Sequence, residues 1–536
     1  MAETTQNSEA EEPAPSDVKM VIGASSAGTV FEWYDFFIYA TLTTSGIIGS
    51  TFFPSGNPAL QTLMAWAGFA VGFGFRPLGA ILFGYLGDKL GRKYTFLVTI
   101  TLMGIATAGI GLIPSTETIG IAAPVLLLLC RVGQGLALGG EYGGAAIYVS
   151  EHSPPGKRGF YTSFIQASVI GGFVLSLAVV LLTKATMSQE VFLEWGWRLP
   201  FLFSLLLLAA SLWMRLMLSE SPVFKAMQEE GEISHNPFIE SFTYPGNTKR
   251  VFVALFGVAA GLTTIWYTAM VYSLEFLKGP ANVTDSAAEL IVCGGALLGS
   301  IMFIVFGKWS DKVGRKKPII IGYILTLLTL FPLFWTMGNA ANPGLDEAAK
   351  SAPVAVSGRD CNFDPFAKEQ ANDCGKVLAV LTGKGVPYTL IKSDQASITV
   401  GETDVGAMNP AALESALTDA GYDFTPVTPS AGSVFVIVLC LLALSVLSGM
   451  TYGPVAALLS EMFPPKIRYS SMSIPYHFGT GYFGGFLPFI ASYIAASTGD
   501  PYSGLWYTWG VVLMALVVAL WGLKGGLPRD FEDNAA

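Results

Sequence analysis

The sequence predicts an all-α membrane protein with twelve transmembrane helices in two pseudo-symmetric six-helix halves and a small soluble α+β insert on the extracytoplasmic side. Three observations support this fold class. Hydrophobic residues make up 52% of the 536 residues and charged residues only 13%, about half the charged share of a soluble protein. The apolar residues gather in blocks of about 20 or more, each long enough to cross a bilayer. Two charged motifs of the first half also recur in the second half.

The apolar blocks define the predicted spans. In chain order they are 20–48, 58–86, 94–113, 119–149, 161–184, 197–218, 250–277, 286–307, 318–338, 432–459, 468–496 and 503–523. The chain is therefore expected to divide into a disordered cytoplasmic tail (1–19), an N-terminal six-helix half (20–218), a cytoplasmic linker (219–249), helices seven to nine (250–338), an extracytoplasmic insert (339–430), helices ten to twelve (431–523) and a cytoplasmic tail (524–536).

The orientation follows from the positively charged connections. The segments on the side of the N-terminus carry 19 lysines and arginines, whereas the short loops of the other side carry only Lys184 and Lys278. The six cations of the long segment 339–430 do not count, because long translocated segments do not obey the charge rule. Cytoplasmic loops are rich in these residues. We therefore expect both termini to lie in the cytoplasm. The net charge of -9 and the lack of a basic patch argue against a nucleic-acid partner.

The stretch 339–430 is too polar to span a membrane and too long for a simple loop. It contains the turn signal Asn342-Pro343-Gly344 and short apolar runs such as 377–380, which favour a small folded α+β domain over disorder. Cys361 and Cys374 are its only cysteines, and an oxidising compartment favours a disulfide between them. No metal site is expected, because the insert has no histidine.

An internal repeat supports the two halves. The motif Gly84-Tyr-Leu-Gly-Asp88-Lys-Leu-Gly91-Arg92-Lys93 recurs as Gly307-Lys-Trp-Ser-Asp311-Lys-Val-Gly314-Arg315-Lys316, and Ser150-Glu151 with the following Pro-Pro and basic residues recurs from Ser460-Glu461. The two copies of the second motif lie about 90 residues further apart in the sequence than the two copies of the first motif. This difference is close to the length of the insert, which therefore interrupts the second half.

These motifs carry a family resemblance. The repeated Gly-x-x-x-Asp-x-x-Gly-Arg-Lys resembles the signature of the major facilitator superfamily, and Arg131-Val-Gly-Gln134-Gly135 and Ser219-Glu220-Ser221-Pro222 resemble two more of its motifs. Segments 31–36, 75–79 and 139–145 are similar to the metabolite:proton symporter family, which includes proline/betaine, α-ketoglutarate, shikimate and citrate carriers. The resemblance covers the helices but not the insert. It implies a monomeric transporter of the bacterial inner membrane, with a proton as coupling ion, no other cofactor and no enzymatic activity.

The charged turns are candidates for a conformational latch. An aspartate there can accept hydrogen bonds from the N-terminus of a neighbouring helix, and an arginine can pair with a carboxylate of another helix. Such contacts hold only while the inner side is closed. The alternative is a plain basic topology signal. The predicted latch residues are Asp88, Arg92, Glu151, Glu220, Asp311 and Arg315.

Charged residues inside predicted spans are costly and usually functional. Glu32 and Asp35 are three residues apart, so they share one helix face. Two close carboxylates in an apolar setting repel each other, which favours protonation of one of them. The alternative is a structural ion pair with Arg76 or Arg131. The residues predicted to couple transport to protons are Glu32, Asp35, Arg131, Glu141 and His477.

Cationic and aromatic side chains are candidates for substrate binding. His477 is the only histidine inside a span, and aromatic rings could serve a quaternary ammonium group. The alternatives are a buried structural histidine and aromatic packing. The predicted substrate site contains Arg76, Arg131, Tyr34, Trp266, Tyr267, Tyr476 and His477.

The sequence thus predicts proton-coupled import of a small polar metabolite by alternating access. A carboxylate substrate is favoured, since two arginines and a histidine offer cationic partners. A betaine or proline importer is the alternative among transporters. Two readings come from other classes: a nutrient sensor that lost transport, and a membrane enzyme acting through the insert. The insert lacks a histidine, a Gly-x-Ser-x-Gly turn and a glycine-rich phosphate loop.

Overall fold

The structure is a computed structural model of the chain. It describes residues 15–90, 92–140, 142–151, 153–154, 156–216, 237–359, 361–406, 408–464 and 467–528. Of the predicted site and latch residues, Glu141 and Glu220 lie outside these ranges. The side chains of Asp88, Arg92 and Glu151 are not described either, although their helices are.

The N-terminal half is a set of long helices joined by short turns. Its first helix begins at Pro15 rather than at residue 20, and proline at a first helical position, followed by an acidic residue, favours such a start. The second and fourth spans are each interrupted once, after Gly74 and after Gly139. The elements are α1 (Pro15–Thr44), α2 (Ile47–Phe52), α3 (Pro58–Gly74), α4 (Arg76–Leu90), α5 (Arg92–Leu112), α6 (Thr116–Ile119), α7 (Ala122–Gly139), α8 (Tyr142–Glu151), α9 (Arg158–Ala185), α10 (Gln189–Val191), η1 (Phe192–Gly196) and α11 (Arg198–Leu216).

The C-terminal half contains several π-helical turns, a local feature that often marks functional sites. They interrupt the seventh span twice and the eleventh span once. The elements are α13 (Pro237–Thr243), α14 (Asn247–Phe252), η2 (Val253–Ala259), α15 (Ala260–Tyr267), η3 (Thr268–Tyr272), α16 (Ser273–Lys278), α17 (Asp285–Val313), α18 (Lys316–Ala341), α22 (Ala431–Tyr452), α23 (Val455–Met462), α24 (Arg468–Phe478), η5 (Gly479–Gly485), α25 (Leu487–Thr498) and α26 (Leu505–Gly522).

The insert folds as a small α+β domain, as predicted. A sheet in the order β2-β1-β3-β4 has β1 parallel to β2 and antiparallel to β3. Asparagine side chains cap each of its helices by accepting a backbone N–H. Cys361 and Cys374 are joined in a disulfide. The elements are α19 (Pro343–Ser351), β1 (Val354–Ser357), α20 (Asp373–Gly383), β2 (Tyr388–Ile391), β3 (Ser397–Val400), β4 (Thr403–Asp404) and α21 (Pro410–Asp419).

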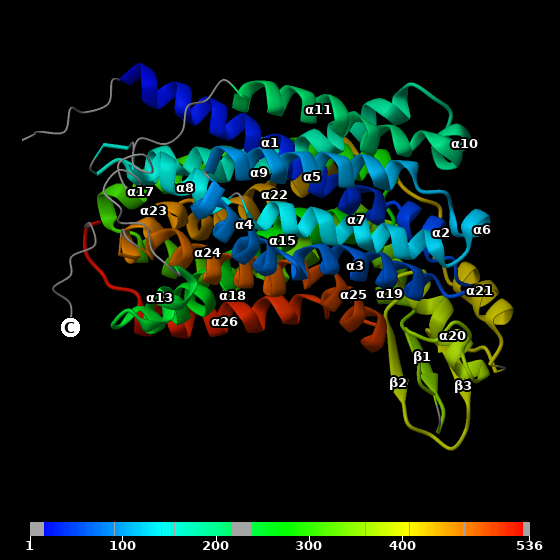
Figure 1. Ribbon diagram of the computed structural model, residues 1–536. Coiled ribbons are helices and arrows are strands. Elements are labelled where there is room, and N and C mark those ends of the chain that lie inside the picture. The colour runs from blue at the N-terminus through cyan, green and yellow to red at the C-terminus, as the bar shows by residue number, and fades with distance from the viewer. Residues whose placement is uncertain are drawn as a thin grey trace, which may run out of the picture.

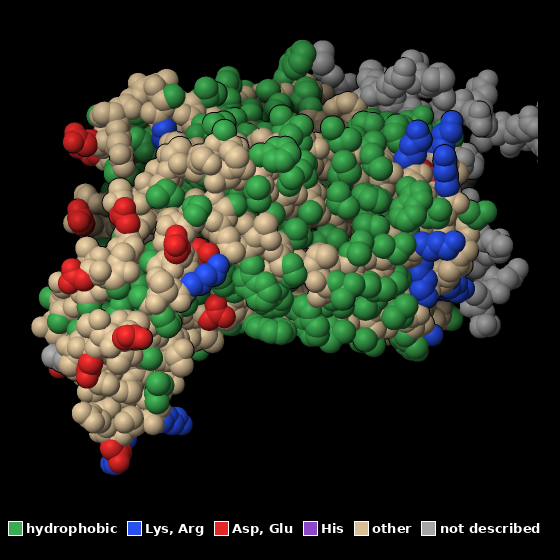
Figure 2. Space-filling view, turned by 180° about the vertical axis from the view of Figure 1, so that it is seen from behind, with side chains coloured by type: hydrophobic (Ala, Val, Ile, Leu, Met, Phe, Trp, Pro, Cys, Tyr) green, Lys and Arg blue, Asp and Glu red, His purple; other side chains and the backbone are tan. Residues whose placement is uncertain are grey.

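The helices form an elongated bundle with the insert at one end. Helix α1 begins and α26 ends at the end of the bundle opposite the insert (Figure 1). Lysine and arginine side chains gather at that end, and hydrophobic side chains cover the middle of the bundle (Figure 2). The end where α1 begins is called the inner end below, and the end with the insert the outer end.

Eight helical stretches of the described chain are long and apolar enough to cross a membrane, or nine if the bent pair at 189–214 is one span. The other predicted spans, 20–48, 94–113 and 468–496, are helical as well. They correspond to α1, which carries two buried acids, to the shorter α5, and to the interrupted run from α24 to α25. The predicted fold class is therefore confirmed.

The two halves meet along a long interface. Helix α9 packs against α17, α4 against α24, and α3 against η5. The approach is close where small residues face each other: a Cβ on Gly307 of α17 would come within 2.5 Å of the carbonyl oxygen of Gly159 at the start of α9. The centre of this interface holds most of the predicted site.

Candidate functional site

Arg131 of α7 is fully buried in the middle of the N-terminal half. Its Nη1 donates to Oε1 of Gln134 at 2.5 Å, and its Nε donates to the carbonyl oxygen of Gly68 at 3.3 Å. The guanidinium carbon lies 4.2 Å from the ring centroid of Phe36 and 4.4 Å from that of Tyr39. A charge so enclosed is stabilised by donated hydrogen bonds and ring faces. In the described chain it forms no salt bridge with Glu32 or Asp35.

Gln134 connects the arginine to helix α1. Its Nε2 donates to the backbone oxygen of Asp35 at 3.2 Å and to Oγ1 of Thr107 at 2.7 Å, while its Oε1 accepts from Arg131. Glu32 and Asp35 are both buried. Within the described residues, Oδ1 of Asp35 has no hydrogen-bond partner. A buried carboxylate in this position must be protonated or acquire a partner.

Arg76 lies at the contact between the halves. It is fully buried at the start of α4, and its guanidinium carbon is 5.2 Å from the ring of Trp33 and 5.1 Å from that of Phe73. Helix α4 packs against α24 of the C-terminal half, which carries His477. The structure therefore places Arg76 and His477 on two helices that contact each other across the interface.

The eleventh span presents a second polar pair. The hydroxyl groups of Tyr476 and Tyr452 lie 2.6 Å apart, and the rings of Tyr476 and His477 are 5.5 Å apart. All three residues are buried. The π-helical turn η5 begins directly after this segment, at Gly479. Tyr452 is not among the residues of the predicted site.

Trp266 and Tyr267 end α15 at the same interface. Phe37 stacks on Trp266 at 5.2 Å between centroids, and Phe73 lies edge-on to Tyr267 at 5.5 Å. In the described part of the protein, neither Nε1 of Trp266 nor the hydroxyl of Tyr267 has a hydrogen-bond partner, although both are buried. Buried donors are normally satisfied. These two are free to bind a ligand between the halves.

Tyr34, also predicted to be in the substrate site, lies away from the interface between the halves. Its hydroxyl donates to the carbonyl oxygen of Pro200 at 2.6 Å, and its ring packs against Phe203 of α11. It therefore faces the interior of the N-terminal half and not the interface. Residue spacing along α1 cannot distinguish these two faces, because the whole helix is apolar around Glu32 and Asp35.

At the inner end, the predicted latch residues of the C-terminal half join the two halves. Asp311 accepts hydrogen bonds from the backbone N–H groups of Gly159 (2.8 Å) and Phe160 (2.9 Å) at the start of α9. Arg315 donates to Asp311 at 2.7 Å and holds both oxygens of Glu461 at 3.0 and 2.7 Å. A carboxylate at a helix N-terminus is stabilised by the free N–H groups and by the helix dipole.

The partner of Arg315 is thus Glu461, a residue that the sequence analysis left out of the latch. The signal was available, because Glu461 is the repeat counterpart of Glu151. Ser150 and Ser460, which precede the two acids, lie 2.6 Å apart through their hydroxyl groups. The inner ends of both halves are therefore in direct contact in this structure.

A second charged network closes the outer end. Glu289 of α17, fully buried, accepts from Lys184 of α9 and from Lys278 of α16, both at 2.7 Å. Lys278 also donates to Ser45, after α1, at 2.8 Å. Lys184 and Ser45 belong to the N-terminal half, so this outer network links the two halves. The sequence analysis used the two lysines only as topology signals and missed Glu289.

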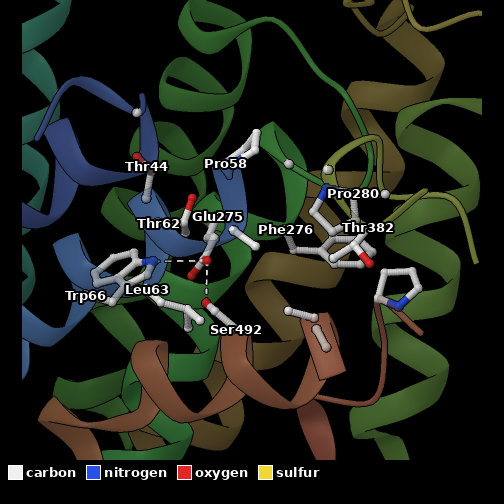
Figure 3. A pocket seen from close by; sticks show the side chains of 18 of the residues that line it. Thr44, Pro58, Thr62, Leu63, Trp66, Glu275, Phe276, Pro280, Thr382 and Ser492 are labelled. Carbon is white, nitrogen blue, oxygen red and sulfur yellow. Dashed lines mark hydrogen bonds between the residues drawn. The ribbon is translucent and has the colours of Figure 1, made fainter. Parts of the chain in front are cut away.

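Glu275 forms a further polar cluster beside a cavity at the outer end. Its Oε1 accepts from Nε1 of Trp66 at 3.0 Å and from Oγ of Ser492 at 2.6 Å (Figure 3). Trp66 belongs to α3 of the N-terminal half, and Ser492 to α25. This cluster was also missed, because a single acid near the end of an apolar block resembles an ordinary helix end.

Comparisons with known proteins place this architecture in a family. A family model described as sugar (and other) transporter matches residues 20–244. The inner membrane metabolite transport protein YhjE of Escherichia coli K12 is 32% identical over 523 residues, which cover 96% of this chain and 97% of that protein. The shikimate transporter of the same strain is 38% identical over 319 residues, covering 58% and 71%. The proline/betaine transporter of Salmonella typhimurium is 37% identical over 325 residues, covering 59% and 64%.

Solved structures show the same fold. The crystal structure of a D-xylose–proton symporter matches with a TM-score of 0.59 and 16% identity, covering 96% of this chain and all of the other (100%). A partially occluded inward-open structure of the xylose transporter XylE from E. coli matches with a TM-score of 0.58 and 16% identity, covering 94% and 97%. The repeated halves, the charged turns and the relative that matches over nearly its full length all indicate the same family. The chain belongs to the major facilitator superfamily of membrane transporters.

Proposed function

We propose that this transporter is a symporter that imports a small polar metabolite together with a proton. The observation that carries the proposal is the buried carboxyl group of Asp35, whose Oδ1 has no partner among the described residues, on the residue whose backbone oxygen Gln134 links to Arg131. Together with an arginine that forms no salt bridge in the described chain and the unpartnered donors of Trp266 and Tyr267, such an acid supports coupled binding of a proton and an anion.

In the proposed cycle, the substrate binds between the halves while Asp35 carries a proton. After the substrate leaves on the inner side, Asp35 releases its proton and pairs transiently with Arg131 or Arg76. Deprotonation is thereby linked to emptying of the site. Glu32 shares the face of Asp35 and is the second candidate, and His477, on α24 beside the α4 helix of Arg76, is the third. Glu141, outside the described residues, remains part of the proposed coupling set.

A carboxylate is the proposed substrate group. Arg76 and Arg131 are buried cations, and Trp266 and Tyr267 add two neutral donors. A zwitterionic osmolyte is the second candidate. It is favoured by the rings of Trp33, Phe37 and Trp266, which stack in succession at 5.2 Å between centroids, and by the similarity to a proline/betaine transporter.

The proposed orientation has both termini in the cytoplasm and the insert outside. Lysine and arginine gather at the inner end (Figure 2), and cytoplasmic loops are enriched in these residues. The test uses single cysteines in place of Gln395 on the insert and Lys312 at the inner end. The first should react with an impermeant maleimide on intact cells and the second only after permeabilisation. The reverse pattern would invert the proposed topology.

We propose that the N-terminal half contains a second copy of the inner latch, because the motif residues are repeated there. Asp311 and Arg315 correspond to Asp88 and Arg92, and Glu461 corresponds to Glu151. We therefore propose that Arg92 pairs with Glu151, whereas Glu220 is the alternative partner. Cysteines in place of Arg92 and Glu151 should be joined by a short bifunctional crosslinker under conditions that favour the inner-closed state. Crosslinking of the Arg92 and Glu220 positions instead would select the alternative.

The coupling test begins with a substrate. A thermal-shift screen of purified protein against organic acids, betaines and amino acids identifies a ligand by its stabilising effect. Uptake of that ligand is then measured in proteoliposomes with an imposed pH gradient. We expect Asp35→Asn to abolish accumulation against the substrate gradient. Counterflow exchange should survive, because exchange does not require the empty carrier to reorient.

The controls separate coupling from folding. Asp394→Asn, an exposed substitution on the insert, should leave both assays unchanged. Glu32→Gln is measured beside Asp35→Asn to identify which acid carries the proton. If both variants of α1 accumulate the substrate at the wild-type level, α1 is not the coupling site, and the two acids are then structural.

A further inference from the structure

A cavity of about 270 Å³ lies at the outer end, where the two halves and the insert meet. Trp66 of α3 lines it from the N-terminal half, Glu275 and Ser492 from the C-terminal half, and Thr382 and Val386 from the insert (Figure 3). It is distinct from the central site, which lies between Arg131, Tyr267 and His477. The proposed function assigns no role to this cavity.

Glu275 is the only charged side chain among the described residues that line the cavity. Both of its hydrogen bonds, from Trp66 and Ser492, go to Oε1. Its Oε2 is buried and has no partner in the described part of the chain. A carboxylate oxygen left in this way is stabilised by a ligand that brings a positive charge or a proton donor.

The protein supplies no cation of its own to Glu275. Lys278 follows one turn later on α16, but its ammonium group pairs with Glu289 at 2.7 Å and donates to Ser45 at 2.8 Å. Lys184 pairs with the same glutamate. Glu275 forms no salt bridge with any described residue, so its ionised form would need a positive charge supplied by a ligand.

The rest of the lining is mainly apolar and aromatic. Tyr272 and Phe276, on the same helical run as Glu275, add rings beside Trp66. One carboxylate among aromatic rings is an arrangement that recognises an alkylated ammonium group, through charge and cation–π attraction. We propose that this cavity is an outer binding site for a compact organic cation, held by Glu275.

The insert lines this site and is attached to both halves. Nδ2 of Asn57, before α3, donates to the carbonyl oxygen of Ala367 at 2.8 Å. On the other half, Phe366 stacks on Tyr493 of α25 at 5.4 Å. The residues that line the cavity come from both halves and from the insert. The insert thus supplies part of the proposed binding site.

The test measures binding directly, without a pH gradient, so its result does not depend on the proposed coupling mechanism. Wild-type protein in lipid nanodiscs is titrated by calorimetry with choline and with 3,3-dimethyl-1-butanol, its uncharged analogue of the same shape. We expect choline to bind and the alcohol to bind at least about tenfold more weakly, because the alcohol lacks the charge. This comparison uses only the unaltered protein.

Variants then locate the site. Glu275→Gln keeps the shape of the side chain and an oxygen that can accept from Trp66 and Ser492. It should weaken choline binding at least about tenfold, since it removes only the charge. Glu190→Gln, an exposed carboxylate of α10 at the same end, is the matched control and should bind choline as the wild type does. The melting temperature of each variant is recorded to confirm folding.

Three outcomes would overturn the proposal. The first is equal affinity of choline for wild type and Glu275→Gln. The second is equal affinity of choline and the uncharged alcohol for the wild type. The third is no binding of choline, tetramethylammonium or glycine betaine up to millimolar concentrations. If succinate binds instead and Glu275→Gln strengthens it, the cavity is an anion site and the proposal is wrong.

Discussion

Replacing Lys184 by glutamine should open the outer end of the interface. Lys184, from the N-terminal half, pairs with Glu289 of the C-terminal half at 2.7 Å and lies 3.5 Å from Asp285. Glu289 keeps its second partner Lys278 within the same half when Lys184 is removed. Lys184→Gln therefore deletes a contact between the halves and leaves no buried charge alone.

The size of the effect follows from burial. The side chain of Lys184 is 16% exposed and that of Glu289 is 0% exposed. Exposed ion pairs contribute about 0.2–1 kcal/mol, and breaking a fully buried pair costs about 3–5 kcal/mol. Lys184 is partly exposed and Glu289 keeps Lys278 as a partner, so the cost falls between these values, at about 1–2 kcal/mol. The equilibrium between outer-closed and outer-open states should thus shift about tenfold.

Glu289→Gln should act differently. It leaves Lys278, only 3% exposed, with Asp285 at 3.9 Å as its nearest carboxylate. An almost unpaired buried ammonium costs about 3–5 kcal/mol. This variant should therefore lower the melting temperature of the purified protein as well as open the outer end. Lys184→Gln should change the conformational equilibrium with little loss of thermal stability.

The assay is a distance measurement between the halves. Spin labels are placed at Glu190→Cys of α10 and Ser286→Cys of α17, with Cys130, Cys293 and Cys440 replaced by serine. Double electron–electron resonance should show a longer-distance population that grows in Lys184→Gln. Lys376→Gln, an exposed lysine of the insert, is the control. Distance distributions that stay unchanged in both Lys184→Gln and Glu289→Gln would refute the outer network as a gate.

Two further predictions concern the inner latch and the insert. Asp311→Asn should favour the inner-open state by about 1–2 kcal/mol, because the charge that holds the N-terminus of α9 and Arg315 is lost; spin labels at the inner end check this, and an unchanged distance would contradict it. Replacing Cys361 and Cys374 by serine should destabilise the insert by about 3 kcal/mol, as expected for a loop of this length, with a sequence separation of 13. Limited proteolysis should then cut the insert faster and spare the helices, and equal cleavage rates would show that the disulfide does not stabilise it.

The spans were predictable because each is an apolar block, and the inner latch because its aspartate and arginine stand in a repeated motif. The sequence could suggest Trp266 and Tyr267 as aromatic residues in a span. It could not show that their buried N–H and O–H groups have no hydrogen-bond partner among the described residues. Glu289, Glu275 and Lys278 were hidden because charges near the ends of spans are common. Their meaning depends on packing between distant helices, since Lys184 and Glu289 are 105 residues apart. Only the fold brings α9, α16 and α17 together.

The inner latch and the outer network, which act as two gates, explain how the central site can be isolated from both sides. In this structure the inner end is held by Asp311, Arg315 and Glu461, and the outer end by Lys184 and Glu289. Each gate joins α17 to α9, so one helix pair carries both contacts. A rocking motion that opens one end breaks that gate and leaves the other intact, and gates of similar strength prevent either open state from dominating. A ligand then needs only a modest difference in affinity between the two states to drive the change. By the same reasoning, Lys184→Gln combined with Asp311→Asn should return the balance between the two open states toward that of the wild type while reducing the occluded population.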